Sequence, residues 1–182
     1  MLRPHLDGML LALLLPALAG CSATLTDFER TLAANDSATA ALGQWCERRG
    51  LARPPVIRAI SDPAAAPVSL AVRQSLEISA DEPVAYRHVR LVCGNRTLSV
   101  AHNWYVPSRL TPEMNRALTT TDTPFGKVVA PLRFQRERLA QRRGAMEQCP
   151  QGTVLSHRAR LRTAEGQVIS LVAECYTTEN IR

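Results

Sequence analysis

Arg87 and Glu174 are charged residues inside apolar segments, and their positions suggest chemistry. Glu174 lies within the apolar run VISLVAECY. Burial raises the pKa of a carboxyl group unless a cation lies beside it, and a raised pKa suits a proton donor. If its segment is a strand, Arg87 shares a face with Val89 and Leu91. A buried arginine needs a carboxylate, which the protein or a ligand can supply.

Both charged positions also have plainer explanations. Glu174 could face water on an edge strand, or it could be the partner of Arg87 in a purely structural salt bridge. With the two side chains in one pocket, the pair would suit a small anionic ligand.

The segment TTTDTPFGKVVAPL places Phe125 between Pro124 and Gly126. A Pro-X-Gly turn at the start of a helix can present the backbone N–H of its central residue to an anion. Phe125 would then offer its amide, and its ring would form a wall of the pocket. The alternative is an ordinary helix-initiating turn with the ring in the core.

The elements that position these residues can be read from their periodicity. Residues 24–50 show helical spacing in two pieces, and Asp36 or Ser37 can cap the second. VIRAIS (56–61) reads as a strand. PVAYRHVRLVC and RTLSVAHNWYV form an expected hairpin around Gly94 and Asn95.

The second half of the chain continues this mixture. Thr111 is the expected N-cap of a short helix that opens with Pro112. RFQRERLAQRRGAMEQ fits either a strand or a helix, while TVLSHRARLR and QVISLVAECYT read as strands. We therefore predict one α+β domain over residues 21–182, with an antiparallel sheet, an N-terminal helix and inserted short helices.

The N-terminus resembles a bacterial lipoprotein signal. The apolar run MLLALLLPALAG is shorter than the roughly 20 residues of a membrane-spanning helix. It ends in LAGC, similar to a lipobox, which predicts a signal peptide over residues 1–20 and lipidation of Cys21. An ordinary secretory signal with a chance cysteine is the alternative. Ser22 after the cysteine favours a periplasm-facing anchor in the outer membrane.

Four further cysteines follow, namely Cys46, Cys93, Cys149 and Cys175. An even number in an exported chain predicts two disulfides with three possible pairings, and buried free thiols are the alternative. No cysteine or histidine spacing indicates a metal. The net charge is +6, and no basic run is interleaved with stacking aromatics, which argues against nucleic-acid binding.

From about Asp81 to Tyr176 the chain resembles chorismate pyruvate-lyase and the related UTRA ligand-sensing domains. The resemblance rests on YRHVRLVCG, LTPEMNRAL, TPFG, HRARLR and SLVAECY. It implies that Arg87 binds the substrate carboxylate, that the amide of Phe125 contacts the ligand, and that Glu174 is the acid. It also implies elimination of pyruvate from chorismate to give 4-hydroxybenzoate, without a metal or organic cofactor.

Two functions are therefore expected from the sequence. The first is a chorismate-lyase-type enzyme acting on chorismate or a similar anionic metabolite. The second is a non-catalytic envelope lipoprotein that binds an aromatic or other anionic small molecule on the same scaffold. The predicted export favours the second, because the lyases and their substrate are cytosolic.

Overall fold

The computed structural model describes the backbone from Ala17 and the side chains from Thr24 to Arg182. Most of the predicted leader (1–20) and the side chain of Cys21 lie outside the described residues. The helices are α1 (Ala17–Ala33), α2 (Ala38–Arg48), α3 (Leu70–Leu76), α4 (Pro112–Thr120) and α5 (Phe125–Val128), with 3-10 turns η1 (Pro107–Arg109), η2 (Ala130–Leu132) and η3 (Thr178–Asn180). The strands are β1 (Ile57–Ser61), β2 (Ala85–Cys93), β3 (Arg96–Tyr105), β4 (Gln135–Arg143), β5 (Leu155–Arg162) and β6 (Val168–Tyr176).

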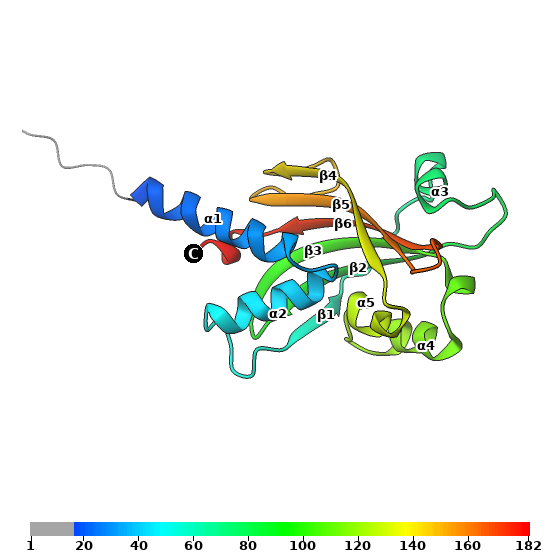
Figure 1. Cartoon of the computed structure of the whole chain (residues 1–182), viewed down its shortest axis with the longest axis horizontal. Helices are drawn as coiled ribbons and strands as arrows, with labels where there is room; N and C mark the ends of the chain where they lie inside the picture. Colours follow the sequence, from blue (N-terminus) through cyan, green and yellow to red (C-terminus); the bar gives the residue numbers. More distant parts are fainter. Residues whose placement is uncertain (1–16) are drawn as a thin grey trace, which may run out of the picture.

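These strands form one antiparallel sheet in the order β1-β2-β3-β6-β5-β4. The expected α+β architecture is confirmed, with helices before and between the strands (Figure 1). The fully buried β6 lies in the middle of the sheet, between β3 and β5. Its central position explains why its sequence is an apolar run rather than an alternating one.

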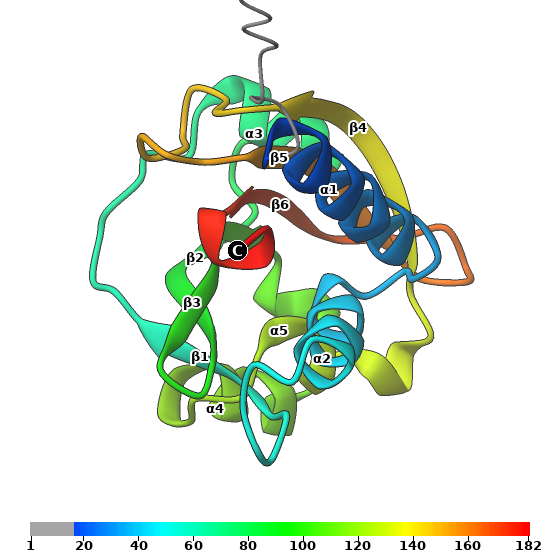
Figure 2. The same cartoon turned by 90° about the vertical axis from the view of Figure 1, so that its left-hand side faces the viewer.

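Helices α1 and α2 cover one face of the sheet, which we call the inner face (Figure 2). Phe28 of α1 and Trp45 of α2 pack against each other, and Phe28 also contacts the ring of Tyr176 from β6. Helix α2 begins where the sequence predicts, because the hydroxyl of Ser37 accepts a hydrogen bond from the Ala40 amide. This packing fixes the start of α2 above the sheet.

Helices α4 and α5 extend the inner layer beyond α2. Thr111 caps α4 and Pro112 is its first residue, as expected. Leu118 of α4 and Phe125 of α5 belong to a second apolar cluster that includes Tyr105 of β3. The segment from Thr119 to Leu132 is therefore anchored against the end of the sheet.

Helix α3 packs against the opposite, outer face, and the sequence analysis did not predict it. Val72 and Leu76 contact an apolar cluster that includes Trp104 of β3 and Leu171 of β6. Ser69 caps the helix, and Glu77 ends it in the left-handed conformation. The sequence RFQRERLAQRRGAMEQ (133–148) fits either a strand or a helix. In the structure it forms the edge strand β4 and the loop that follows it.

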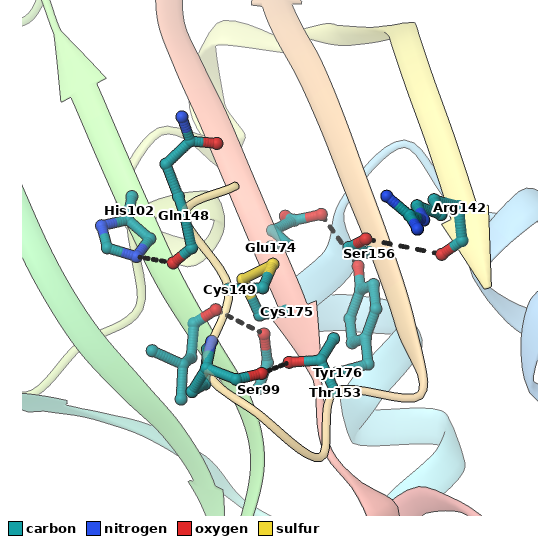
Figure 3. Close-up of a disulfide and its surroundings, with 12 residues drawn as sticks. Ser99, His102, Arg142, Gln148, Cys149, Thr153, Ser156, Glu174, Cys175 and Tyr176 are labelled. Carbon is teal, nitrogen blue, oxygen red and sulfur yellow. Dashed lines mark hydrogen bonds between the residues drawn. A yellow bond between two sulfur atoms is a disulfide. The ribbon is translucent and has the colours of Figure 1, made fainter. Parts of the chain in front are cut away.

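Both expected disulfides are present. Cys46 at the end of α2 bonds Cys93 at the end of β2, and Cys149 bonds Cys175 of β6. The second bond ties the β4–β5 loop to the outer face, where the carbonyl of Gln148 also accepts a hydrogen bond from Nε2 of His102 (Figure 3). Among the helices in the described part of the chain, none is long and apolar enough to cross a membrane.

Replacing either cysteine pair by serine should lower the free energy of unfolding by about 2–4 kcal/mol. The loss should be larger, by about half a kcal/mol, for Cys46–Cys93, because it closes 47 residues where Cys149–Cys175 closes 26. Urea unfolding of the oxidised variants measures both values.

Thiol titration of the denatured native protein should find no free thiols at these positions, and four free thiols would contradict the pairing.

Candidate functional site

A small cavity of about 50 Å³ lies between the inner face of the sheet and the first residues of α2 and α5. Arg87, Phe125 and Glu174, which come from distant parts of the sequence, all line it. The antiparallel register brings Arg87 and Glu174 together, because Glu174 lies opposite Ala101, and Asn103, two residues further along β3, lies opposite Arg87. Phe125 reaches the cavity from α5. The structure thus places the three predicted site residues around one space, and their roles in binding or catalysis stay predictions.

Glu174 is buried, with 7% of its side chain exposed, and Arg136 of β4 is its ion-pair partner. The guanidinium of Arg136 donates two hydrogen bonds to the carboxylate, one from each terminal nitrogen. The hydroxyl of Tyr176 donates a third hydrogen bond at 2.8 Å (Figure 3). Glu174 therefore pairs with Arg136 and leaves Arg87 without this carboxylate.

The buried pair also changes the acid–base properties of its neighbours. Burial works most strongly against the charge of Arg136, but Glu174, together with Tyr176 and Asp36, outweighs it and raises the pKa of the guanidinium. Burial raises the pKa of Tyr176 well above the usual range, and the charge of Glu174 adds to this effect. Both groups are therefore firmly protonated and donate to the Glu174 carboxylate.

Arg87 has no acidic partner among the described residues. Its guanidinium donates one long hydrogen bond, 3.5 Å, to the carbonyl oxygen of Thr123. Burial lowers the pKa of Arg87, and nearby Tyr105 opposes that effect. A partly desolvated cation with this single weak contact can accept an anion from outside the chain.

Asn103 is a site residue that the sequence analysis missed. It lines the cavity at 4% exposed and lies directly opposite Arg87 in the β2–β3 register. Its side-chain oxygen accepts a hydrogen bond from Ser170, while its Nδ2 has no partner. Buried donors are nearly always satisfied, so an unpaired amide on a residue that lines a cavity indicates that a ligand or water completes it. An asparagine on the strand face that also carries Ala101 and Tyr105 was the signal available in the sequence.

The TPFG segment lies against the start of α2. A Cβ on Gly126 would come within 2.7 Å of Oγ of Ser37, so only glycine allows this approach. Among the described residues, no acceptor pairs with the amide N–H of Phe125 or Gly126. The ring of Phe125 is buried against Tyr105, with ring centroids 5.5 Å apart. The ring thus packs in the core, and Phe125 and Gly126 also line the cavity.

His157 lies beside the buried pair and was also not predicted. It is 2% exposed, pairs across the sheet with Glu174, and has no partner for its Nε2. Burial is the main cause that lowers its pKa to about 4; Arg136 also lowers it, whereas Glu174 raises it. His157 is therefore neutral at pH 7.

Stability should fall as the pH decreases from 6.5 to 4. The unfolded chain takes up a proton on His157 near pH 6.5, and the folded chain does not until about pH 4, so protons favour unfolding in this window. The contribution is up to about 3 kcal/mol, and His157→Gln should remove it. Urea unfolding at each pH measures the difference. Burial also lowers the pKa of His102, but this residue contributes equally to the wild type and to His157→Gln, so its effect cancels in the difference between them. Equal pH profiles for the two proteins would contradict the prediction.

The comparisons with known proteins first define a class of fold. The effector domain of PhnF from Mycobacterium smegmatis superposes with a TM-score of 0.55 at 10% identity, covering 79% of this chain and 90% of that one. The possible transcriptional regulator YydK from Bacillus subtilis gives 0.50 at 13% identity over 69% of this chain, which spans 60% of YydK. The domain thus has the chorismate-lyase-like fold of UTRA domains.

At the level of sequence, the chain belongs to the same family as the uncharacterized protein y4mC of Sinorhizobium fredii. The two are 38% identical over 176 residues, which cover 85% of this chain and 74% of y4mC. No protein-family model matches the chain. In the part of the chain that the structure describes, no group of three or more histidine, cysteine or acidic side chains could hold a metal ion.

Proposed function

We propose that this protein binds the anionic group of a small organic acid in the inner-face cavity without transforming it. The observation that carries the proposal is that two unsatisfied hydrogen-bond donors lie side by side. Arg87 has no acidic partner in the described chain, and the adjacent Asn103 has a free Nδ2. A carboxylate has two oxygens that can accept from both.

The surroundings of the two donors suit an anion. The amides of Phe125 and Gly126 are unpaired, and Ala38 and Thr39 at the start of the 11-residue helix α2 line the same cavity. Exposed N–H groups at a helix start favour negative charge. Of the two carboxylates that line the cavity, Glu174 is neutralised by Arg136, and Asp36 accepts a hydrogen bond from the backbone amide of Arg136.

The geometry of Glu174 favours binding over lyase chemistry. A general acid must carry a proton and release it to the substrate. In this structure the carboxylate accepts two hydrogen bonds from Arg136 and one from Tyr176. Hydrogen bonds to the ionised form oppose protonation. The three hydrogen bonds to Glu174 therefore support a structural role for this carboxylate rather than that of the acid in a lyase.

The test combines binding and turnover on one preparation. The full chain is titrated calorimetrically with benzoate and 4-hydroxybenzoate, and it is separately incubated with chorismate. We expect binding of the carboxylates and no pyruvate above a protein-free control. Pyruvate formation would establish the lyase alternative instead. A folded protein that binds neither carboxylate would remove the proposed site.

We also propose that the domain is exported and held at the periplasmic face of the outer membrane by a lipid on Cys21. The support is the LAGC sequence after an apolar run. The two disulfides are compatible with an oxidising compartment.

Cys21→Ser should abolish membrane attachment, because the serine hydroxyl cannot take the thioether-linked lipid. The variant should appear as an unprocessed precursor or as a soluble periplasmic protein. Cell fractionation with immunoblotting measures this, and Cys46→Ser serves as a control for loss of a cysteine elsewhere. A Cys21→Ser protein that is cleaved normally and stays in the membrane fraction would rule out the anchor.

A further inference from the structure

A groove of about 510 Å³ lies beside the cavity, on the solvent-exposed side of α2. One wall is the exposed side of α2 around Ala40 and Gly43, and the other runs from Gly126 through Ala130 to Phe134. Figure 2 shows α2 and α5 next to each other at this place, and the two helices are in contact. The groove thus opens between the N-terminal helices and the TPFG segment.

The groove and the cavity share part of their walls. Asp36, Ser37, Thr39, Gly126 and Phe134 line both spaces. The same residues therefore border both the inner cavity and the groove, and the two spaces adjoin along them.

The two spaces differ in size and in chemistry. The cavity, about 50 Å³, is comparable to one or two water molecules and accommodates a group such as a carboxylate. The groove has the volume of a typical small-molecule site. Its lining is mainly apolar and includes Val56, which is 48% exposed. Lys127 and Arg133 add two cations against the single carboxylate of Asp36.

We propose that the ligand is an acid with an extended apolar body. Its anionic group lies in the cavity against Arg87 and Asn103, and its apolar body lies in the groove between α2 and Phe134. The inference rests on the proposed function and adds the class of ligand. The basic rim at Lys127 and Arg133 attracts the acid and does not hold its head group, because the groove has no buried unpaired donor like Asn103 Nδ2.

Gly43 offers a direct way to fill the groove. It lies within α2 on the groove wall, and a Cβ placed on it meets no atom within 4 Å. Gly43→Phe should therefore project a ring into the groove without disturbing the helix. Replacing a glycine inside a helix is favourable for the backbone, so the variant should fold. Gly43→Ala is the matched control, with the same backbone gain and almost no added volume.

The experiment titrates the full chain in detergent with butyrate, hexanoate and octanoate. In the wild type and in Gly43→Ala, affinity should rise about two- to fourfold for each methylene that enters the groove. In Gly43→Phe the three acids should bind with equal affinity. Val56→Asp, at an exposed position, is a second variant that should flatten the series by repelling an apolar chain. Partition of the acids into detergent is common to all variants and cancels.

The outcomes separate this inference from the function on which it rests. Binding that depends on Arg87 but does not strengthen with chain length would overturn the extended ligand and leave the anion site intact. A gain with chain length that persists in both Gly43→Phe and Val56→Asp would place the apolar body elsewhere and also overturn it. No binding of any of these acids to the folded protein would overturn both.

Discussion

Arg87→Ala should weaken binding of small carboxylates by roughly thirtyfold to several thousandfold. The expected loss is about 2–5 kcal/mol, since the variant removes the one cation that faces the cavity without an acidic partner in the described chain. The remaining donors, Asn103 Nδ2 and the backbone amides, are neutral and cannot compensate for the charge. Isothermal titration with 4-hydroxybenzoate measures the change, and the folded state is checked by circular dichroism.

Arg90→Ala is the matched control for Arg87→Ala. Arg90 lies three residues further along β2, so its side chain points to the outer face, where it is exposed. Its removal changes the net charge of the protein by the same amount without touching the cavity. We expect wild-type affinity for Arg90→Ala. If both variants lose affinity equally, then the general charge of the protein, rather than a site around Arg87, attracts the ligand.

The sequence predicts the local features of this site better than its pairings. The apolar run around Glu174 predicts that this residue is buried, and strand alternation predicts that Arg87 lies on the face that lines the cavity. Ser37 and Thr111 cap their helices because a hydroxyl before a helical segment satisfies its free amides. Each of these features depends on residues within a few positions of one another, which is the range over which periodicity carries information.

Arg136 could not be identified from the sequence because its partner is 38 residues away. The stretch around it contains several arginines with no clear period, and β4 has an irregularity between Arg138 and Ala140 that changes the phase of the side chains. Strand register does not select it either, because Arg136 lies opposite Leu161 while Glu174 lies opposite His157. The long side chain of Arg136 reaches Glu174 diagonally across β5, a contact that only the three-dimensional structure shows.

Helix α3 was missed for a different reason. It has seven residues and no acidic residue in its first turn, and Glu77 rather than glycine ends it in the left-handed conformation. Short helices of this kind are stable through packing rather than through propensity. Val72 and Leu76 gain that packing from Trp104 and Leu171, which are distant in the sequence.

Breaking the Arg136–Glu174 pair should cost more stability than any other single change that we consider. Both side chains are 7% exposed, so neither charge is well solvated when its partner is removed. Arg136→Met leaves the Glu174 carboxylate with only the Tyr176 hydroxyl, and Glu174→Leu leaves the Arg136 guanidinium unpaired. Each variant should lose about 3–5 kcal/mol of unfolding free energy, measured by urea denaturation at pH 7.

The double variant Arg136→Met/Glu174→Leu distinguishes a structural pair from a functional one. Apolar side chains of similar volume can replace a buried ion pair at little cost, so the double variant should recover most of the stability that either single variant loses. Additive losses would show that the two residues do not interact as the structure places them. If the pair serves only to neutralise and shape the cavity wall, the double variant should also keep carboxylate affinity within a few fold, because Arg87 and Asn103 are untouched. A recovered fold that no longer binds any carboxylate would instead assign the pair a direct part in holding the ligand.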